Sequence, residues 1–90
     1  MTVEVKATPT RNEHSVIFKL NKTLIPMGTG LTFPTAESAR NHPLAHALFQ
    51  IEGVLSVWIL GDEVQVTKDE SLRWTRVHSK VIETIRRIES

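Results

Sequence analysis

The run from Pro43 to Asp69 constrains the fold of this chain most, because nearly every residue in it has an identifiable structural role. Four apolar residues in its first part repeat at i, i+3, i+4 and i+7, the spacing of one face of an α-helix. Pro43 suits the first helical position, and Gly53 can adopt the left-handed conformation that ends a helix. We therefore predict a helix that begins at Pro43 and stops near Glu52, with one buried face formed by Leu44, Ala47, Leu48 and Ile51.

The second part of this run predicts a β-hairpin. A mostly apolar segment from Val54 to Leu60 is interrupted by Gly61 and Asp62 before apolar residues resume in alternation. Two such segments joined by two residues are typical of a tight hairpin in which the glycine has a positive φ. If Leu60 pairs with Glu63, apolar partners coincide on one side of the ribbon. This register predicts the pairs Ile59–Val64 and Val57–Val66.

Alternation of apolar and polar residues predicts a second hairpin near the N-terminus. Val3 to Thr8 and Ser15 to Leu20 both show this pattern, as half-buried strands do, and a polar, turn-rich segment joins them. Lys22 to Pro34 instead carries two Pro and two Gly among scattered apolar residues. We predict that this third segment is an ordered irregular loop packed on the domain.

Two further helices are predicted outside the central run. Thr35 offers a side-chain oxygen that can cap a short helix over Ala36 to Asn41, with Glu37 in its first turn. A longer helix is predicted from about Leu72 to near the end of the chain. Its apolar residues repeat at helical spacing and form the stripe Trp74, Val77, Val81, Ile85 and Ile88.

The predicted elements follow the order ββαββα in one domain that spans residues 1–90. Because the strands alternate and each principal helix has one apolar stripe, the simplest arrangement packs both helices against one face of a single sheet. The fold class that we predict is therefore α+β. Its architecture is a two-layer sandwich with a four-stranded, mainly antiparallel sheet and two helices on one face.

Features of the central run, taken together, resemble those of a known family. They are Pro-Leu-Ala and Leu-Phe in the helix, Gly-Val after it, a hydrophobic strand, an Asp in the turn, a Val-Thr-Lys strand end and Trp74. On these residues the chain resembles the N-terminal domain of Nfu/NifU-type iron–sulfur scaffold proteins, from about Thr8 to Ile88. Further similarity to the family's Thr-Pro-Asn-Pro-Asn loop and Thr-Phe-x-x-Ala-Glu segment lies at Thr8, Pro9 and Asn12, and at Thr32, Phe33, Ala36 and Glu37.

The sequence also departs from this family pattern. Thr10 and Arg11 stand where Asn and Pro are usual, two extra residues lie near Glu13 and His14, and Glu63 replaces the usual aromatic residue. These departures concern loop-specific roles. The resemblance implies the same two-layer fold and a role in protein recognition during iron–sulfur cluster assembly or delivery. In that family the cluster-binding Cys-x-x-Cys lies in a separate C-terminal domain, which this sequence lacks.

Composition restricts the chemistry available to the chain. The sequence has no cysteine, which excludes disulfides, thiolate nucleophiles and cysteine ligation of zinc or iron–sulfur clusters. A formal net charge of +1 provides little general attraction to nucleic acid or to an anionic membrane. No apolar run is long enough for a membrane helix, and the first residues show no signal-peptide pattern. We expect a cytoplasmic protein with no cofactor and no membrane partner.

The outward side of the predicted sheet is the candidate protein-binding surface. In the predicted register the residues that face the helices are Leu55, Val57 and Ile59. Those that point away are Ser56, Trp58 and Leu60, joined by Ile17 from the other hairpin. A two-layer fold leaves this side uncovered, and Trp with aliphatic neighbours often anchors a protein partner. The alternative, which the sequence leaves open, is ordinary surface cover by Lys6, Lys19 and Gln65.

Other residues suggest sites of different kinds. Thr8, Pro9 and Asn12 match the family loop and are added to the partner-binding candidates, although small polar turn residues mostly cap the backbone. His42 and His46 are spaced i, i+4 and are the metal candidates. Because Pro43 pushes the preceding residue out of helical geometry, we expect His42 to be a cap or loop residue instead. No third ligand is apparent beside this pair.

Four basic residues fall on one stripe of the C-terminal helix, where they could bind phosphates or an acidic partner. They are Arg73, Arg76, Lys80 and Arg87. The simpler interpretation is a solvated helix face, because no aromatic side chains interleave with these charges. We therefore do not expect nucleic acid to be the partner.

The sequence does not predict an enzyme, since it contains neither a nucleophile turn nor a Gly-rich phosphate loop. The leading hypothesis is a non-catalytic protein-interaction module associated with iron–sulfur cluster assembly or delivery, which does not itself ligate a cluster. Its expected partner is an iron–sulfur scaffold or acceptor protein, and it is expected to be a monomer or a weak homodimer. The first alternative is a protein that binds iron or another metal ion with His and carboxylate ligands, and the second is a weak nucleic-acid binder through the basic stripe of the C-terminal helix.

Overall fold

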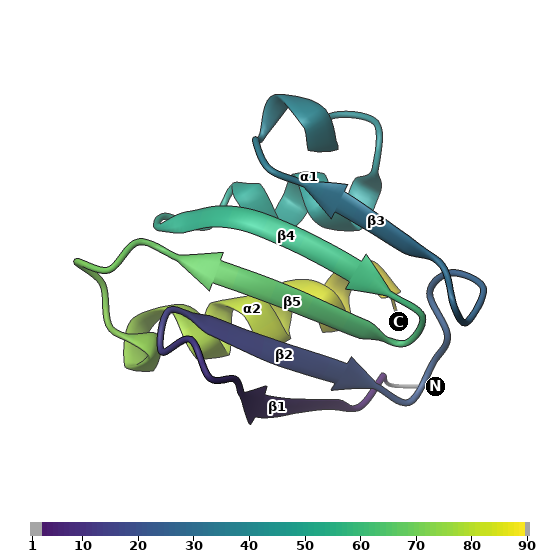
Figure 1. Cartoon of the computed structure of the whole chain (residues 1–90), viewed down its shortest axis with the longest axis horizontal. Helices are drawn as coiled ribbons and strands as arrows, with labels where there is room; N and C mark the ends of the chain where they lie inside the picture. The colour runs from purple at the N-terminus through teal and green to yellow at the C-terminus, as the bar shows by residue number, and fades with distance from the viewer. Residues whose placement is uncertain (1–2, 90) are drawn as a thin grey trace.

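One five-stranded antiparallel sheet organises the molecule, with the strand order β1-β2-β5-β4-β3 (Figure 1). The computed structural model describes residues 3–89, except for the side chain of Arg76. The strands are β1 (Val5–Pro9), β2 (Ser15–Leu20), β3 (Gly30–Phe33), β4 (Val54–Leu60) and β5 (Glu63–Lys68). The helices are a 3-10 helix η1 (Glu37–Ala39), α1 (Pro43–Phe49) and α2 (Trp74–Glu89).

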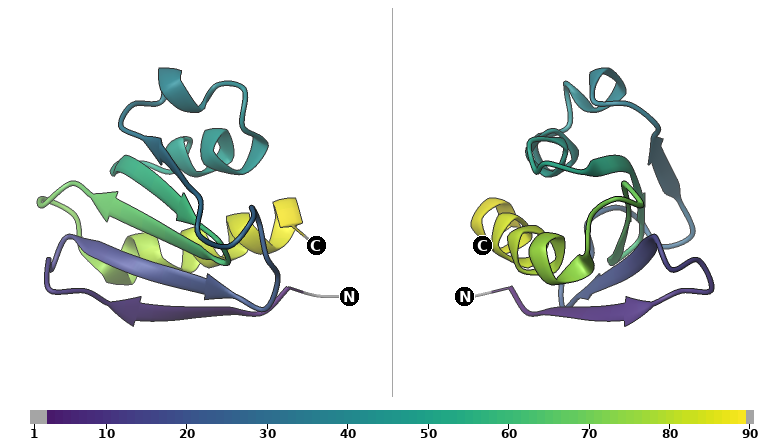
Figure 2. Two further views of the ribbon diagram at one scale, coloured as in Figure 1. Left: turned by 45° about the vertical axis from the view of Figure 1, so that its right-hand side comes forward. Right: turned by 90° about the vertical axis from the view of Figure 1, so that its left-hand side faces the viewer.

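Both α-helices pack on the same face of the sheet, which confirms the predicted two-layer α+β architecture (Figure 2). The predicted apolar stripe of α2 is buried at Val77, Val81 and Ile85. The buried face of α1 supplies Leu44 and Leu48 to the same core. Their partners on the inner face of the sheet are fully buried, chiefly Phe18, Val57, Ile59, Val64 and Val66. The core therefore lies between the helices and this one face, and no helix of residues 3–89 covers the opposite face.

The β4–β5 hairpin has the predicted register. Leu60 pairs with Glu63, Ile59 with Val64 and Val57 with Val66. Gly61 has a φ of 60° in the turn, and no described residue other than glycine has a positive φ. The turn therefore has a positive φ at its first central position only, as in a type II′ turn.

The prediction of a four-stranded sheet was wrong by one strand. Gly30–Phe33, expected to be part of an irregular loop, forms β3 and pairs antiparallel with β4 at the edge of the sheet. Four residues between Pro and Gly punctuation are too few to show a clear alternation. The strand forms because β4 presents an unpaired edge, which is a property of the tertiary structure.

The end of α1 was also predicted wrongly. The helix ends at Phe49, and the Ile51 N–H then donates to the Leu48 carbonyl in a tighter turn. Gly53 has the expected positive φ, at 95°. It lies in a separate turn closed by a 3.2 Å hydrogen bond from the Val54 N–H to the Ile51 carbonyl. This glycine therefore directs the chain into β4 instead of capping the helix.

A β-bulge corrects one predicted core residue. The β4–β5 register shifts between Val54 and Ser56, so Val54 is buried while Leu55 is 53% exposed. A bulge inserts one extra residue and thereby changes the side to which its neighbours point. Beyond this bulge, Val57 and Ile59 face the core as predicted.

The short helix predicted over Ala36 to Asn41 is a single 3-10 turn, η1. Thr35 contributes as expected, because its Oγ1 accepts a 3.2 Å hydrogen bond from the Ser38 N–H. Ser38 Oγ accepts a bond of the same length from the Thr35 N–H. This reciprocal pair closes the turn, which leads directly into the cap of α1.

Candidate protein-binding face of the sheet

One row of side chains crosses all five strands on the helix-free face of the sheet. The pairings place it in the order Thr8, Ile17, Gln65, Trp58 and Thr32. Ile17 on β2 and Trp58 on β4 thus lie on either side of Gln65 on β5. The structure brings together the apolar residues that the sequence predicted for this face, although they come from separate hairpins. We call these five residues the Trp58 row.

The apolar side chains of this face lie beside the polar Gln65 of the central strand and are accessible. Trp58 is 42% exposed and Leu60 is 37% exposed. A small hollow of about 50 Å³ is lined by Ile17, Trp58, Leu60, Glu63 and Gln65. Neighbouring side chains therefore cover Trp58 only in part, and the alternative of ordinary surface cover stays open.

The neighbouring row of the sheet, which contains Leu60, also carries charged residues. Lys6 pairs with Lys19, Lys19 with Glu63, and Glu63 with Leu60. The face therefore combines an apolar anchor with a charged border, an arrangement common in protein interfaces. Such a border contributes more to orientation and association rate than to affinity.

Trp58 depends on a residue that the sequence analysis did not identify. A Cβ atom at position 30 would lie 3.1 Å from Trp58 Nε1 and 3.5 Å from Leu60 Cδ1. Gly30 therefore lets the indole occupy the space over β3 that a side chain would fill. A glycine opposite a large strand residue is the signal that could have identified this position, but only once β3 and β4 were known to pair.

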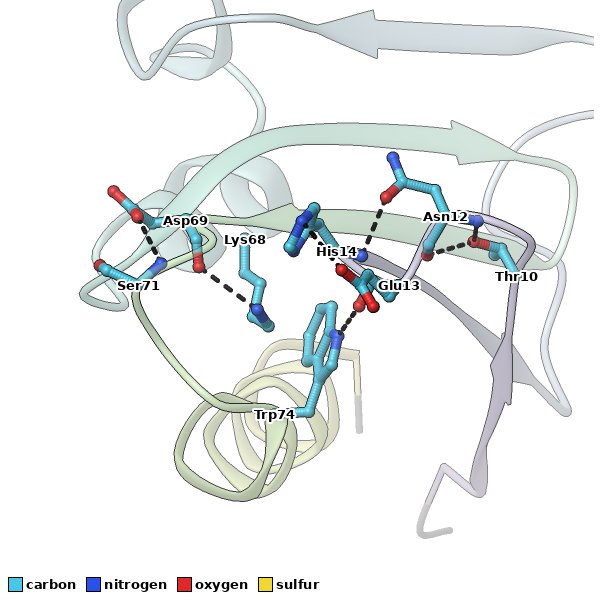
Figure 3. Close-up of polar contacts among 8 residues, drawn as sticks. All are labelled: Thr10, Asn12, Glu13, His14, Lys68, Asp69, Ser71 and Trp74. Carbon is cyan, nitrogen blue, oxygen red and sulfur yellow. Dashed lines mark hydrogen bonds and ion pairs between the residues drawn. The ribbon is translucent and has the colours of Figure 1, made fainter.

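The three residues that match the family loop, Thr8, Pro9 and Asn12, lie in different places. Thr8 belongs to the Trp58 row, whereas Pro9 ends β1 at the edge of the sheet. Asn12 caps the turn, because its Oδ1 accepts a 2.9 Å hydrogen bond from the His14 N–H (Figure 3). Thr10 Oγ1 accepts a 3.1 Å bond from the Asn12 N–H. The backbone-capping interpretation of Asn12 is therefore supported by its geometry.

A polar cluster joins this loop to the start of α2 (Figure 3). Trp74 Nε1 donates a 2.9 Å hydrogen bond to the Glu13 carbonyl, and its ring packs 6.3 Å from that of Phe18. Lys68 is only 5% exposed, and its ammonium lies 5.6 Å from the centroid of the Trp74 ring. Trp74 is thus the predicted packing anchor and in addition ties α2 to the loop between β1 and β2.

The turn before α2 is held by Asp69. Its Oδ1 accepts a 2.8 Å hydrogen bond from the Ser71 N–H. The hydrogen bonds from Ser71, followed by the nearby charge of Lys68, lower the pKa of the Asp69 carboxyl from its ordinary value. This carboxylate acts on its own backbone turn, as an Asx turn does.

The predicted metal candidates have a structural explanation. His42 caps α1, because its Nδ1 accepts a 3.2 Å hydrogen bond from the Ala45 N–H. Its extended backbone, with φ −111° and ψ 109°, is the geometry expected before Pro43. His46 lies within α1. Within residues 3–89, no three His, Asp or Glu side chains come together in a group suited to hold a metal ion.

Of the predicted basic stripe, Lys80 and Arg87 lie on the exposed side of α2, and Arg73 directly precedes the helix. Arg73, Lys80 and Arg87 are exposed, and the side chain of Arg76 lies outside the described part of the chain. Lys80 and Arg87 line a groove between α1 and α2 together with Glu52 and Glu83. Acidic side chains are therefore interspersed with these cations, which does not favour phosphate binding. None of the described helices could span a membrane.

Comparisons with known proteins identify relatives of this chain. Residues 5–90 match the family model described as the scaffold protein Nfu/NifU N terminal. NifU-like protein 5, mitochondrial, of Arabidopsis thaliana is 36% identical over 82% of this chain and 26% of its own length. The mitochondrial NFU1 iron-sulfur cluster scaffold homolog of Drosophila virilis is 32% identical over 94% of this chain and 28% of its own length.

A solved structure supports the fold independently. The solution structure of a NifU-like protein from Saccharomyces cerevisiae superposes with a TM-score of 0.81. It is 24% identical, and the match covers 96% of this chain and 77% of that one. The curated relatives are longer proteins, since this chain spans only about a quarter of the two described above. The match therefore concerns one part of those proteins.

Proposed function

The chain belongs to the Nfu/NifU N-terminal family, and on that premise we propose that it is a non-catalytic protein-interaction module acting in iron–sulfur cluster assembly or delivery. The observation that carries this proposal is Trp58, which is 42% exposed on a sheet face that no helix of residues 3–89 covers. Tryptophan is enriched among the residues that contribute most to protein binding. The partner in this proposal is an iron–sulfur scaffold or acceptor protein.

The proposed module does not ligate the cluster itself. Iron–sulfur clusters in proteins are held mainly by cysteine thiolates, and this sequence has no cysteine. In the proposed mechanism the cluster stays on a cysteine-containing domain or partner. The module contributes by holding the two proteins together, which raises the effective concentration of donor and acceptor sites.

The Trp58 face fits such a role physically. Ile17, Trp58 and Leu60 offer apolar contacts on regular strands, so little conformational entropy is lost when a partner binds. Lys19 and Glu63 at the border supply both charge signs for orientation. We expect the free chain to be a monomer or a weak homodimer through this face. We also expect a cytoplasmic location, whereas the relatives named above carry mitochondrial names.

A pull-down with apo-forms of iron–sulfur acceptor proteins tests the proposed function. We expect Trp58→Ala and Trp58→Glu to reduce partner recovery by at least about tenfold, since hot-spot residues contribute about 2 kcal/mol or more. Leu55→Glu is the matched control, because Leu55 is equally apolar and exposed but lies at the bulge, outside the Trp58 row. Partner recovery that is unchanged in Trp58→Glu would refute the assignment of this face.

A further inference from the structure

The two edges of the sheet differ in how their free backbone groups are used. Just before β1, the Glu4 carbonyl accepts a 3.2 Å hydrogen bond from the Asn21 N–H, so the backbone groups of Glu4 point toward β2. This direction alternates from residue to residue along an antiparallel strand, and the backbone groups of Pro9 therefore point away from β2. Pro9 has no N–H to offer there. The Val3 carbonyl, just before the strand, accepts a 3.2 Å bond from Arg86 Nε. These features at the two ends of β1 disfavour the addition of another strand along this edge.

The edge at β3 is different. Leu60 and Glu63 flank the two-residue turn and exchange backbone hydrogen bonds across it. Because the direction of the backbone groups alternates along a strand, the N–H and C=O groups of Ile59 point toward β3. Ile59 pairs with Leu31, and therefore the N–H and C=O groups of Gly30 and Thr32 point away from β4. Within residues 3–89, no hydrogen bond to these four groups is present. The strand also contains neither proline nor a charged residue.

The unpaired edge is continuous with the Trp58 row. Thr32 lies directly opposite Trp58, and the indole lies over Gly30. A residue on an added strand opposite Gly30 would point to the same side of the sheet, with no intervening side chain. It could therefore contact Trp58 and Leu60 across position 30. Within the described residues, the Trp58 indole N–H also makes no hydrogen bond.

We propose that β3 is the docking edge for an extended segment of a partner protein, which adds as a sixth strand through the backbone of Gly30 and Thr32. One side chain of this segment lies opposite Gly30 and packs against Trp58 and Leu60. Strand addition of this kind obtains affinity from main-chain hydrogen bonds and specificity from alternate side chains. The inference rests on the proposed function, because it describes how a partner of the Trp58 face binds.

A partner segment fits this edge better than a second copy of the chain. If two β3 strands paired antiparallel in the register that joins both outward residues of each copy, Gly30 of one copy would face Thr32 of the other. Threonine is too short to reach across Gly30 and cover the indole. A longer uncharged side chain in a partner segment can do so, and it meets no ionic group on β3.

Peptide selection provides a probe that does not depend on iron–sulfur proteins. Random twelve-residue peptides displayed on phage are selected on the immobilised chain, and the binders are synthesised. We expect a saturating peptide to slow hydrogen exchange at the Gly30 and Thr32 amides by at least about tenfold. The amides of Leu31 and Phe33 already bond to β4 and should change little.

Substitutions at Thr32 and Gly30 test the proposed strand addition on a folded protein. Thr32→Pro removes an outward N–H, whereas Thr32→Val keeps it. Of these two variants, we expect only Thr32→Pro to bind the peptide at least about tenfold more weakly. Gly30→Ala keeps every backbone group but places a methyl 3.1 Å from Trp58 Nε1, and should also weaken binding. If the amide spectrum shows that Thr32→Pro does not fold, the affinity of Gly30→Ala for the peptide tests the inference instead.

Several outcomes would overturn the inference. They are a selection that recovers no binder, binders that leave the Gly30 and Thr32 amides unprotected, and equal affinity for the proline and valine variants. Protection of these amides that rises with protein concentration alone would identify a second copy as the occupant instead. Failure of the proposed function is a separate result, because peptides could add to β3 even if no iron–sulfur acceptor protein is recovered in the pull-down.

Discussion

At residue 53 the backbone has a φ of 95°, and a Cβ atom there would lie 2.1 Å from Leu72 Cδ1. Two separate physical requirements therefore meet at one glycine: a left-handed backbone and a close approach of the segment that leads into α2. Gly28 has a similar φ of 89° but no heavy atom within 4 Å of the corresponding position. Substitutions at Gly53 and Gly28 can therefore distinguish the free-energy cost of a left-handed backbone from that of a steric clash.

We predict that Gly53→Ala destabilises the protein more than Gly28→Ala. Both substitutions put a side chain on a left-handed backbone, which costs about 1–2 kcal/mol. Only the first also forces the end of the Leu72 side chain to move, which adds about 0.5–1.5 kcal/mol if it leaves its preferred rotamer. Urea unfolding followed by circular dichroism measures both free energies of unfolding. Equal losses in the two variants would contradict the predicted contact with Leu72.

At the scale of elements, α2 is attached to the sheet through more than its apolar stripe. Trp74 lies at the first residue of the helix and bonds to the Glu13 carbonyl in the loop between β1 and β2. The loop is thereby held against the beginning of α2. This attachment connects segments 61 residues apart in the sequence.

We predict that Trp74→Phe lowers the free energy of unfolding by about 1 kcal/mol, because it removes this hydrogen bond while keeping an aromatic ring. Trp58→Phe is the matched control, since Trp58 is 42% exposed and its change should cost less than about 0.5 kcal/mol. Thermal or urea unfolding of both variants provides the comparison. A loss in Trp58→Phe as large as that in Trp74→Phe would show that the Trp74 bond does not stabilise the fold.

At the scale of the whole molecule, every strand and both α-helices contribute to one hydrophobic core. A chain of 90 residues buries only about 60–65% of its unfolded surface, so its parts depend on one another for stability. The predicted single domain over residues 1–90 has a direct thermodynamic consequence. It requires all probes to report the same unfolding transition.

We predict coincident urea transitions by far-ultraviolet circular dichroism and by tryptophan fluorescence. The two Trp→Phe variants leave one indole each, at the start of α2 or on the outer face of β4. Within each variant the fluorescence midpoint should equal the circular dichroism midpoint, because one core supports both regions. A midpoint that differs between probes of the same variant would show that the chain unfolds in more than one unit.

Parts of the fold and of the site could be predicted from the sequence because they depend on residues close together in the chain. Helical spacing placed the α2 stripe, Gly61 placed the hairpin turn, and that turn set the pairing of Val57 with Val66. Trp58 and Ile17 could be assigned to one face because strand alternation is a local property.

Other features were decided only by contacts between distant segments. The bulge that exposes Leu55, the joining of β3 to the edge of β4, and the indole of Trp58 over Gly30 all depend on which strands pair. No local periodicity encodes such pairing, since it depends on which edges remain free after the hairpins form. The sequence by itself therefore determined the hairpins, the apolar faces and the absence of thiolate ligands. Tertiary structure decided which edge of the sheet remains open beside Trp58, because a free edge exists only once every other strand has found its neighbour.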